Sequence, residues 1–210
     1  GLPVFETRMA ERPEDVAAAA AALFDAGYSA VVAKSQLGAS GIGILKLGRE
    51  CLNGGSPPPR YMFHEGPCMV QGWLDETVAG VRRIGSPSVQ LFLTDDAISL
   101  YDVTEQLLSG ESIHQGNVSP PPYLAKDEAT LDEMLAQARA AAEWLYAQGY
   151  RGPGSVDFLL IERAGRRIPY VCEINARVTG ATYPAVLARK FLPGGAWLMC
   201  NLMFAPPLPG

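Results

Sequence analysis

Apolar and polar positions along the chain follow two patterns, which predict three helices among many short strands. A proline and two acids at 13–15 precede an alanine-rich run that ends at Gly27, and this order is typical of a helix. Apolar residues recur every three to four positions over 126–148, which predicts a second helix. A third helix is expected over about 183–192.

Short apolar runs between these helices predict strands, most of them paired in antiparallel hairpins. The expected strands cover residues 28–34, 44–47, 68–74, 88–96, 97–103, 156–162 and 168–174. Residues 48–60 and 109–122 are rich in glycine, proline and polar residues, so loops are expected there. The pattern as a whole predicts an α+β fold.

Composition and charge narrow the class of protein further. Apolar residues make up 48% of the 210 residues and charged residues 19%, which allows a buried core. The net charge of −5 argues against a nucleic-acid partner, which favours a basic surface. No apolar run reaches the roughly 18 residues of a membrane span. The four cysteines form no CxxC pair, so no zinc site is expected, and a cytoplasmic protein is favoured.

A lysine and a glycine-rich loop form the first candidate site. Lys34 ends the predicted strand 28–34, and Gly38, Gly41 and Gly43 lie in the loop that follows. Glycine lets backbone N–H groups approach phosphate oxygens closely, and a lysine adds a positive charge beside them. The loop is not a P-loop, because a second strand rather than a helix follows it. Taken alone, the pattern favours a flexible surface turn.

Two carboxylates and an amide form the second candidate site. Glu173 and Asn175 lie two residues apart on one predicted strand, so both side chains leave it on the same face. Asp157 lies on the preceding strand and stands opposite them if the register allows. This oxygen-only set suits Mg²⁺, and the apolar neighbours predict buried acids that need a cation. The alternative is an ion pair of Glu173 with Arg177 that only closes the fold.

Taken in order, these segments resemble the ATP-grasp superfamily of carboxylate–amine ligases, and most closely its amino acid and peptide ligases. The resemblance covers nearly the whole chain. The matching segments are Lys34 with its glycine loop, Val70-Gln71-Gly72-Trp73-Leu74, Val156-Asp157-Phe158 and Cys172-Glu173-Ile174-Asn175-Ala176-Arg177. The resemblance implies an ATP-grasp fold with two lobes of antiparallel sheet plus helices and the nucleotide site between them.

The resemblance implies a nucleotide-binding role for several positions. Lys34 would hold the ATP phosphates, and the loop would fold over them through Gly38, Ser40, Gly41 and Gly43. The hinge that reads the adenine edge would consist of Gln71, Gly72, Trp73 and Leu74. Either Asp75 or Glu76 would take the ribose hydroxyls.

The resemblance also implies metal-binding and catalytic roles. Asp157, Glu173 and Asn175 would bind Mg²⁺, with Mn²⁺ as a substitute, and Arg177 would stabilise the acyl-phosphate. His114, in the expected loop 109–122, would contact substrate or developing negative charge in the acceptor pocket. A solvated histidine is the alternative for His114.

The domain organisation follows from the same resemblance. Residues 1–74 would form the small lobe with the flap and hinge, and residues 75–210 the large lobe with the metal site. The family normally has a further N-terminal domain that supplies a second phosphate-binding lysine, so the chain is expected to be a fragment of a longer protein. Ala176, where the family usually has proline, and Gly72, often a larger residue, depart from the family pattern.

The implied reaction is ATP- and Mg²⁺-dependent ligation. A small-molecule carboxylate attacks the γ-phosphate of ATP and becomes an acyl-phosphate, and an amine then displaces phosphate to form an amide. The alternatives are an acid–thiol ligase, a biotin-carboxylase-like enzyme and a non-catalytic ATP-binding module. A homodimer is compatible with the resemblance.

Overall fold

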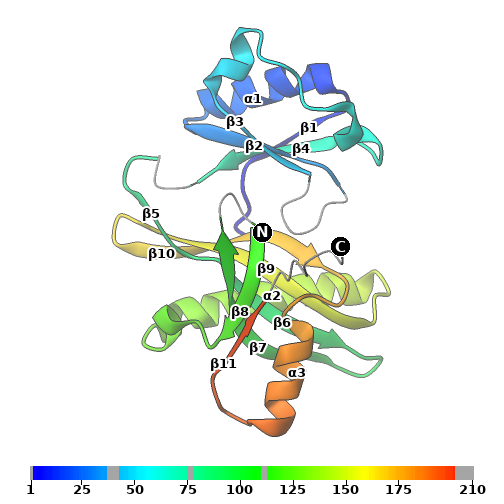
Figure 1. The fold of residues 1–210 in the computed structure, drawn as a ribbon, viewed down its shortest axis with the longest axis vertical. Helices are drawn as coiled ribbons and strands as arrows, with labels where there is room; N and C mark the ends of the chain where they lie inside the picture. Colours follow the sequence, from blue (N-terminus) through cyan, green and yellow to red (C-terminus); the bar gives the residue numbers. More distant parts are fainter. Residues whose placement is uncertain (1, 37–42, 75–77, 110–112, 202–210) are drawn as a thin grey trace, which may run out of the picture. The chain divides into compact units, whose positions relative to one another are not determined.

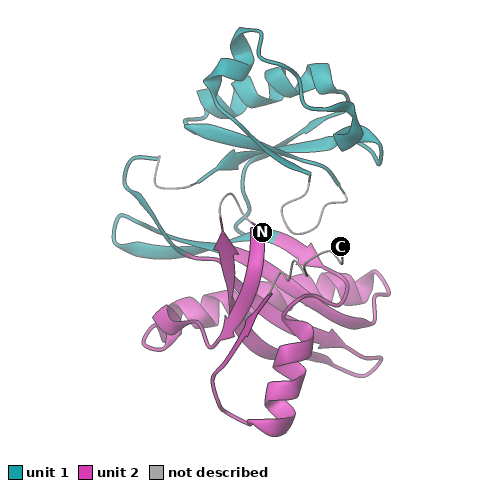
Figure 2. Cartoon of the chain, viewed as in Figure 1, with its two compact units in different colours: residues 1–84, 159–172 teal, residues 85–158, 173–210 magenta. Residues whose placement is uncertain are grey.

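The computed structural model describes residues 2–36, 43–74, 78–109 and 113–201. Its fold is built mainly from antiparallel strands with few helices (Figure 1), which confirms the predicted α+β class. The chain divides into two compact units (Figure 2). One contains residues 1–84 and 159–172, and the other contains residues 85–158 and 173–210. The predicted lobe boundary lay at 74/75, whereas this division falls at 84/85. It also assigns residues 159–172, the tip of a later hairpin, to the first unit.

The first unit contains a four-stranded sheet in the order β1-β4-β2-β3. Its strands are β1 (Thr7–Ala10), β4 (Cys68–Trp73), β2 (Ala30–Lys34) and β3 (Ile44–Leu47), and their pairings are antiparallel. The helix α1 (Val16–Asp25) follows the short 3₁₀ turn η1 (Pro13–Asp15) and packs against β1, β4 and β2. Leu23, Phe24, Val31 and Val70 lie in the resulting core. This hydrophobic layer fixes the end of β2 that carries Lys34.

A second core in the first unit joins the chain start to the tip of a long hairpin. Phe5, Leu74, Val81 and Ile161 are buried together there. Phe5 also stacks on Tyr170, with ring centroids 5.1 Å apart. Two further 3₁₀ turns, η2 (Arg49–Asn53) and η3 (Arg60–Phe63), precede β4. The expected loop over 48–60 therefore contains a helical turn at its beginning.

The second unit is built on a sheet whose strand order is β10-β9-β6-β7-β8-β11, with β5 also paired to β9. The strands are β5 (Val81–Gly85), β6 (Pro87–Leu93), β7 (Ile98–Ser109), β8 (Ile113–Ser119), β9 (Gly152–Arg163), β10 (Arg166–Asn175) and β11 (Trp197–Cys200). The division between the units falls within β9 and β10. The helices are η4 (Pro122–Leu124), α2 (Glu128–Ala147) and α3 (Thr182–Phe191).

The two faces of the central strand β6 differ in chemistry. Val89, Leu91 and Leu93 are buried on the face where α2 packs against β6 and β7. Ser88 and Gln90 alternate with them and are also buried, with 3% and 0% of their surface exposed. Because successive strand residues point to opposite faces, Ser88 and Gln90 form a buried polar patch on the face opposite α2, next to the exposed Phe92.

The expectation of a loop over 109–122 is wrong for most of this range. β7 runs to Ser109 and β8 occupies Ile113–Ser119, with Leu107 of β7 opposite Gly116 of β8. Glycines and prolines suggested a loop, but the backbone hydrogen bonds of a sheet outweigh weak β-propensity when strands lie on both sides. β1, β5 and β11 are strands in segments where no paired strand was expected. Each is only four or five residues long.

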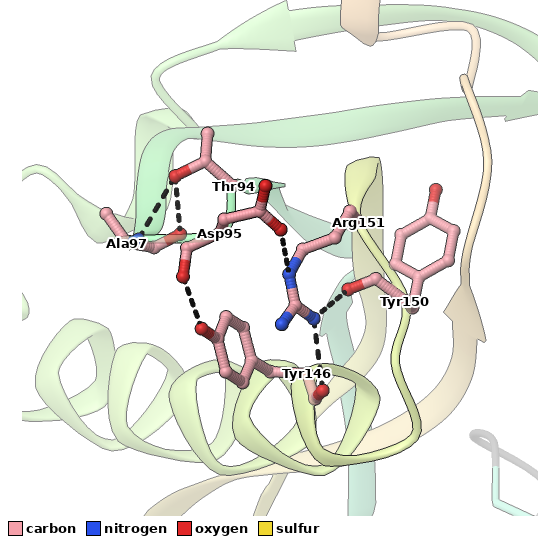
Figure 3. Close-up of polar contacts among 6 residues, drawn as sticks. All are labelled: Thr94, Asp95, Ala97, Tyr146, Tyr150 and Arg151. Carbon is pink, nitrogen blue, oxygen red and sulfur yellow. Dashed lines mark hydrogen bonds and ion pairs between the residues drawn. The ribbon is translucent and has the colours of Figure 1, made fainter.

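Arg151 joins the end of α2 to the β6–β7 turn (Figure 3). Its guanidinium lies 3.6 Å from the centroid of the Tyr146 ring, and its Nη1 donates to the carbonyl oxygens of Tyr146 and Tyr150 at 3.1 and 2.8 Å. Its Nε donates to Asp95 Oδ1 at 3.2 Å, while the Tyr146 hydroxyl donates to the Asp95 carbonyl. The guanidinium thus adds a second hydrogen bond to the Tyr146 carbonyl, which also accepts from Gly149 N at 3.0 Å, and one to the Tyr150 carbonyl beyond the helix.

We expect Arg151→Ala to lower the free energy of unfolding by about 1–2 kcal/mol, because it removes the carbonyl contacts and the cation–π contact together. Asp95→Asn is the matched control. The Asp95 carboxylate is 91% exposed, so losing its ion pair should cost at most about 0.5 kcal/mol. Urea unfolding of both variants gives the two values. Equal losses of stability in the two variants would contradict this role of the Arg151 guanidinium.

Candidate active site

Asp157 lies at the centre of a hydrogen-bonded cluster in the second unit. Its Oδ1 accepts from Ser88 Oγ at 2.6 Å and from Ser155 Oγ at 3.1 Å. Its Oδ2 accepts from Asn175 Nδ2 at 3.0 Å. A carboxylate oxygen has two lone pairs, so these three bonds fill Oδ1 and leave one acceptor position on Oδ2. The sheet register places Ser88 directly opposite Asp157.

Burial and hydrogen bonding act on Asp157 in opposite directions. Burial raises the pKa of its carboxyl above the ordinary value, because a charge is poorly solvated there. The hydrogen bonds from Ser88 and Ser155 lower the same pKa, and so do the charge of Arg177 and the neighbouring His114 side chain. Since burial has the larger effect, a cation beside Asp157 would stabilise its ionised form.

The other predicted metal ligands lie on β10. Asn175 is 5% exposed and contacts Asp157, so these two residues are brought together as expected. Glu173, two positions earlier, is exposed. The expectation that both acids are buried is therefore wrong for Glu173, because the polar end of β10 is not covered on that side. With its Nδ2 turned to Asp157, the Asn175 amide keeps its oxygen for a cation.

Arg177 follows β10 and is exposed. Its Nη1 donates to the carbonyl of Val178 at 3.2 Å. Its charge is near enough to Asp157 to affect that pKa. Among the described residues no group of three histidine, cysteine or acidic side chains is suited to hold a metal. A cation here would thus depend on the amide oxygen of Asn175 and on its own water or phosphate ligands.

His114 lies on β8 and not in a loop, so the expected placement is corrected. Asn117 Nδ2 is 2.9 Å from His114 Nε2, and Asn201 Nδ2 is 3.3 Å from His114 Nδ1. Each ring nitrogen thus has an amide beside it, although a neutral ring can accept a hydrogen bond at only one of the two nitrogens. The ring also packs on Gly180, where an added Cβ would lie 3.0 Å from His114 Cε1.

Lys34 lies in the first unit at the end of β2, opposite Ile44 of β3 and Met69 of β4. Ser35 N donates to Gly43 O at 2.9 Å and closes the base of the glycine-rich loop. Gly43 has a φ of +82°, which favours glycine at the point where the chain enters β3. The flap candidates Gly38, Ser40 and Gly41 lie outside the described residues.

The predicted hinge lies at the end of β4, between β1 and β2. The backbone of Gln71 and Gly72 faces a strand on each side, and Gly72 N donates to Glu6 O at 3.0 Å. Within the described hinge, Leu74 is the first residue beyond the strand, so it is the one whose backbone is not committed to the β4 pairings. Asp75 and Glu76 lie outside the described residues.

The hinge side chains have separate environments. Gln71 Nε2 donates to Thr7 Oγ1 at 2.9 Å, while Gln71 Oε1 is buried without a hydrogen-bond partner in the described part of the chain. The Trp73 ring lies 5.3 Å from Lys46 Nζ. A buried acceptor without a partner is costly, so Gln71 Oε1 has the property expected of a ligand contact.

Several polar residues around Asp157 had not been identified from the sequence. They are Ser88, Gln90, Ser155 and Thr179. The signal that could have found them is strict alternation, since Ser88-Val89-Gln90-Leu91 and Ser155-Val156-Asp157-Phe158 place every polar residue on one face. No described helix is long and apolar enough to cross a membrane.

Comparison with known proteins gives one curated relative and many similar structures. No family model matches the chain. A "[Butirosin acyl-carrier protein]--L-glutamate ligase" of Niallia circulans is 30% identical over 178 residues, which cover 80% of this chain and 38% of the relative. The chain thus spans well under half the length of this relative.

The similar structures agree on one fold. Carboxyaminoimidazole ribonucleotide synthase of Aspergillus clavatus, solved with ATP, has a TM-score of 0.58 at 17% identity and matches 86% of this chain and 42% of its own. Biotin carboxylase of Campylobacter jejuni has a TM-score of 0.62 at 16% identity, over 90% and 40%. D-alanyl-alanine synthetase A of Vibrio cholerae has a TM-score of 0.59 at 13% identity, over 90% and 56%.

Proposed function

We propose that the chain, whose fold matches those of ATP-grasp enzymes, is the ATP-binding part of a carboxylate–amine ligase. The ligase would activate a small-molecule carboxylate as an acyl-phosphate at the expense of ATP and transfer the acyl group to an amine. The observation that carries this proposal is the Asp157 cluster. There a carboxylate is held by three donors, keeps one free acceptor position and lies near Arg177.

The donor set around Asp157 fits Mg²⁺. Asp157 Oδ2, the Asn175 amide oxygen and the exposed Glu173 carboxylate are the hard oxygen ligands that this ion prefers. These residues would hold Mg²⁺, or Mn²⁺ in its place, and the ion would neutralise charge on phosphate oxygens. Burial of Asp157 supports this role, because a cation compensates the cost of its ionised form.

The remaining residues of the proposed site act on phosphate and on the nucleotide. Lys34, at the end of β2, would contribute a positive charge to the phosphates. Arg177 would stabilise the acyl-phosphate through its guanidinium, which is suited to phosphate oxygens. Gln71 Oε1 and the backbone of Leu74 would receive the adenine edge.

The reaction would proceed in two displacements. A carboxylate oxygen of the first substrate attacks the γ-phosphorus, and ADP leaves as the bond between the phosphates breaks. The amine then attacks the acyl carbon, phosphate leaves with the electron pair of the C–O bond, and the amine loses a proton. His114, which lies between Asn117 and Asn201, is proposed to orient the acceptor in the second displacement.

A carrier-bound acceptor is a second candidate, because the relative from Niallia circulans is named for an acyl-carrier protein and L-glutamate. The acceptor would then be an amine or a thiol attached to a carrier protein, in place of a free amine. Free amines, thiols and a carrier protein can be compared in one phosphate-release assay.

The N-terminal domain, a homodimer and a cytoplasmic location stay predictions.

The proposal is tested by calorimetric titration of a non-hydrolysable ATP analogue with and without Mg²⁺. We expect Mg²⁺-dependent binding that weakens about ten- to a hundred-fold in Lys34→Ala and Glu173→Ala, because each variant loses a charge-assisted contact. Lys126→Ala and Glu162→Ala are the matched controls, since they remove the same charges from residues that belong to no proposed contact. Binding that does not require Mg²⁺ and survives in all four variants would contradict the proposed site.

A further inference from the structure

A chain of hydrogen bonds connects the turn after β10 to Asp157. Thr179 Oγ1 donates to Gln90 Oε1 at 3.2 Å, and Gln90 Nε2 donates to Ser88 Oγ at 2.8 Å. Ser88 Oγ in turn donates to Asp157 Oδ1 at 2.6 Å. Every donor in this chain points toward the carboxylate. An ionised Asp157 therefore polarises all three bonds in the same sense.

Gln90 is the residue on which this chain depends. Its side chain is completely buried and uses both ends of its amide, one toward Ser88 and one toward Thr179. Losing either end would leave a buried polar group without a partner, which is more costly than an average hydrogen bond is stabilising. A glutamine in this environment thus has one defined orientation.

The turn that Gln90 contacts is short and fixed from several sides. Thr179 N donates to Thr182 Oγ1 at 2.9 Å, and Thr182 N donates back to the Thr179 carbonyl at 3.1 Å. The next residue, Gly180, lies against the His114 ring. Arg177 lies two positions before Thr179, between this fixed point and the end of β10. The backbone that carries Arg177 is therefore held at both ends.

We infer that Gln90 is a positioning residue, which holds the Arg177-bearing turn in place relative to the Asp157 carboxylate. The roles of Asp157 and Arg177 rest on the proposed function, whereas the contact between Gln90 and the turn does not. A cation bound at Asp157 would fix the position of the carboxylate and of the Ser88 hydroxyl that donates to it. Metal binding would in this way stabilise the turn that presents the guanidinium.

The experiment is hydrogen–deuterium exchange of peptides covering residues 176–182 in the intact protein, first without metal. Thr179→Val keeps the shape of the side chain and removes the hydroxyl that contacts Gln90 Oε1 and Thr182 Oγ1. Gln90→Leu removes both amide contacts of Gln90 and leaves the contact between Thr179 and Thr182 in place. We expect exchange in this segment to become about five-fold faster in Thr179→Val and at least as fast in Gln90→Leu. Because Gln90→Leu alters a buried position, the thermal midpoint of this variant is measured as well. If Gln90→Leu does not fold, Thr179→Val alone provides the test.

Thr104→Val is the matched control. Thr104 is equally buried and lies 3.5 Å from Gln90 Nε2, but it is not on the path to the turn. Its variant should exchange over 176–182 at the rate of the unchanged protein. Unchanged exchange in Thr179→Val, or an equal increase in Thr104→Val, would overturn the inference.

A second arm adds Mn²⁺ and the ATP analogue, with Mn²⁺ binding followed by electron paramagnetic resonance. We expect the ligands to slow exchange over 176–182 in the unchanged protein. In Thr179→Val the same Mn²⁺ should bind, because Ser88 still donates to Asp157, but the slowing should be lost. Slowing that persists in Thr179→Val would contradict the coupling. Failure of the unchanged protein to bind Mn²⁺ would count against the proposed function, and the metal-free arm would still decide the role of Gln90.

Discussion

Replacing Asp157 by asparagine should abolish Mg²⁺-dependent nucleotide binding while the metal-free protein still folds. The variant keeps the size of the side chain and removes the charge that would hold the cation. We expect ligation to fall by at least about a hundred-fold, on the scale of losing a charged group in a preorganised site. The measurement is phosphate release together with analogue titration.

The stability of Asp157→Asn should differ from that of the unchanged protein in its pH dependence. Because the pKa of Asp157 is raised in the folded protein, the folded state holds this proton more tightly than the unfolded chain does. The Asp157 contribution to the free energy of unfolding is therefore favourable at low pH. It falls as the pH rises from about 4 through the raised folded-state value. The asparagine variant lacks that loss, and urea unfolding at several pH values in EDTA measures the difference.

Metal addition separates this effect from a general change in folding. Mg²⁺ with the ATP analogue at a hundred times its Kd should stabilise the unchanged protein by about 2.7 kcal/mol, and Asp157→Asn by almost nothing. Asp102→Asn is the matched control on the same sheet, since Asp102 accepts from Ser119 and Trp197 and belongs to no proposed ligand set. Equal stabilisation of Asp157→Asn and the unchanged protein would show that Asp157 does not hold the cation.

Gly72→Ala should lower the stability of the first unit. A Cβ at Gly72 would lie 2.2 Å from Tyr28 Cε1, so the half-buried tyrosine ring would have to move. Tyr28 packs against both hydrophobic clusters of this unit, and displacing it disturbs the two together. Overpacking of this kind costs about 1–3 kcal/mol, measured by urea unfolding.

A double-mutant cycle tests the cause of that loss. In the Tyr28→Ala background the ring is absent, so adding Gly72→Ala should cost much less than it does alone. Additive losses would mean that the glycine is required for another reason. The contact also explains the departure at Gly72 from the larger residue often found at this hinge position, because here the Tyr28 ring fills the space.

The sequence was most informative where local pattern and chemistry agree. The helices α1, α2 and α3 and the β9–β10 hairpin lie close to their expected ranges, because each depends on contacts between near neighbours in sequence. The Asp157–Asn175 contact could be expected for the same reason, since both residues belong to one hairpin. Amphipathic periodicity and hairpin geometry were sufficient for these features.

The features that escaped prediction depend on distant partners. β8 is a strand because β7 and β11 pair with it, although its own residues include Gly116 and Asn117, which disfavour strands. Gln90 contacts Thr179 across 89 positions of sequence, and no local pattern reports such a pair. The exposure of Glu173 also depends on its tertiary surroundings. Its apolar neighbours in sequence could not indicate it.

The small strand β11 has a consequence for the order in which the protein folds. It is the last described strand, yet it pairs with β8, so Cys200 meets Gly116 across more than 80 residues of chain. Asn201, just beyond β11, donates its N–H to Gln115 and contacts His114. Closing so long a loop is entropically costly, and pairings of this kind form slowly. During synthesis one edge of β8 would stay unpaired until β11 is available. The surroundings of His114 would therefore form late in folding.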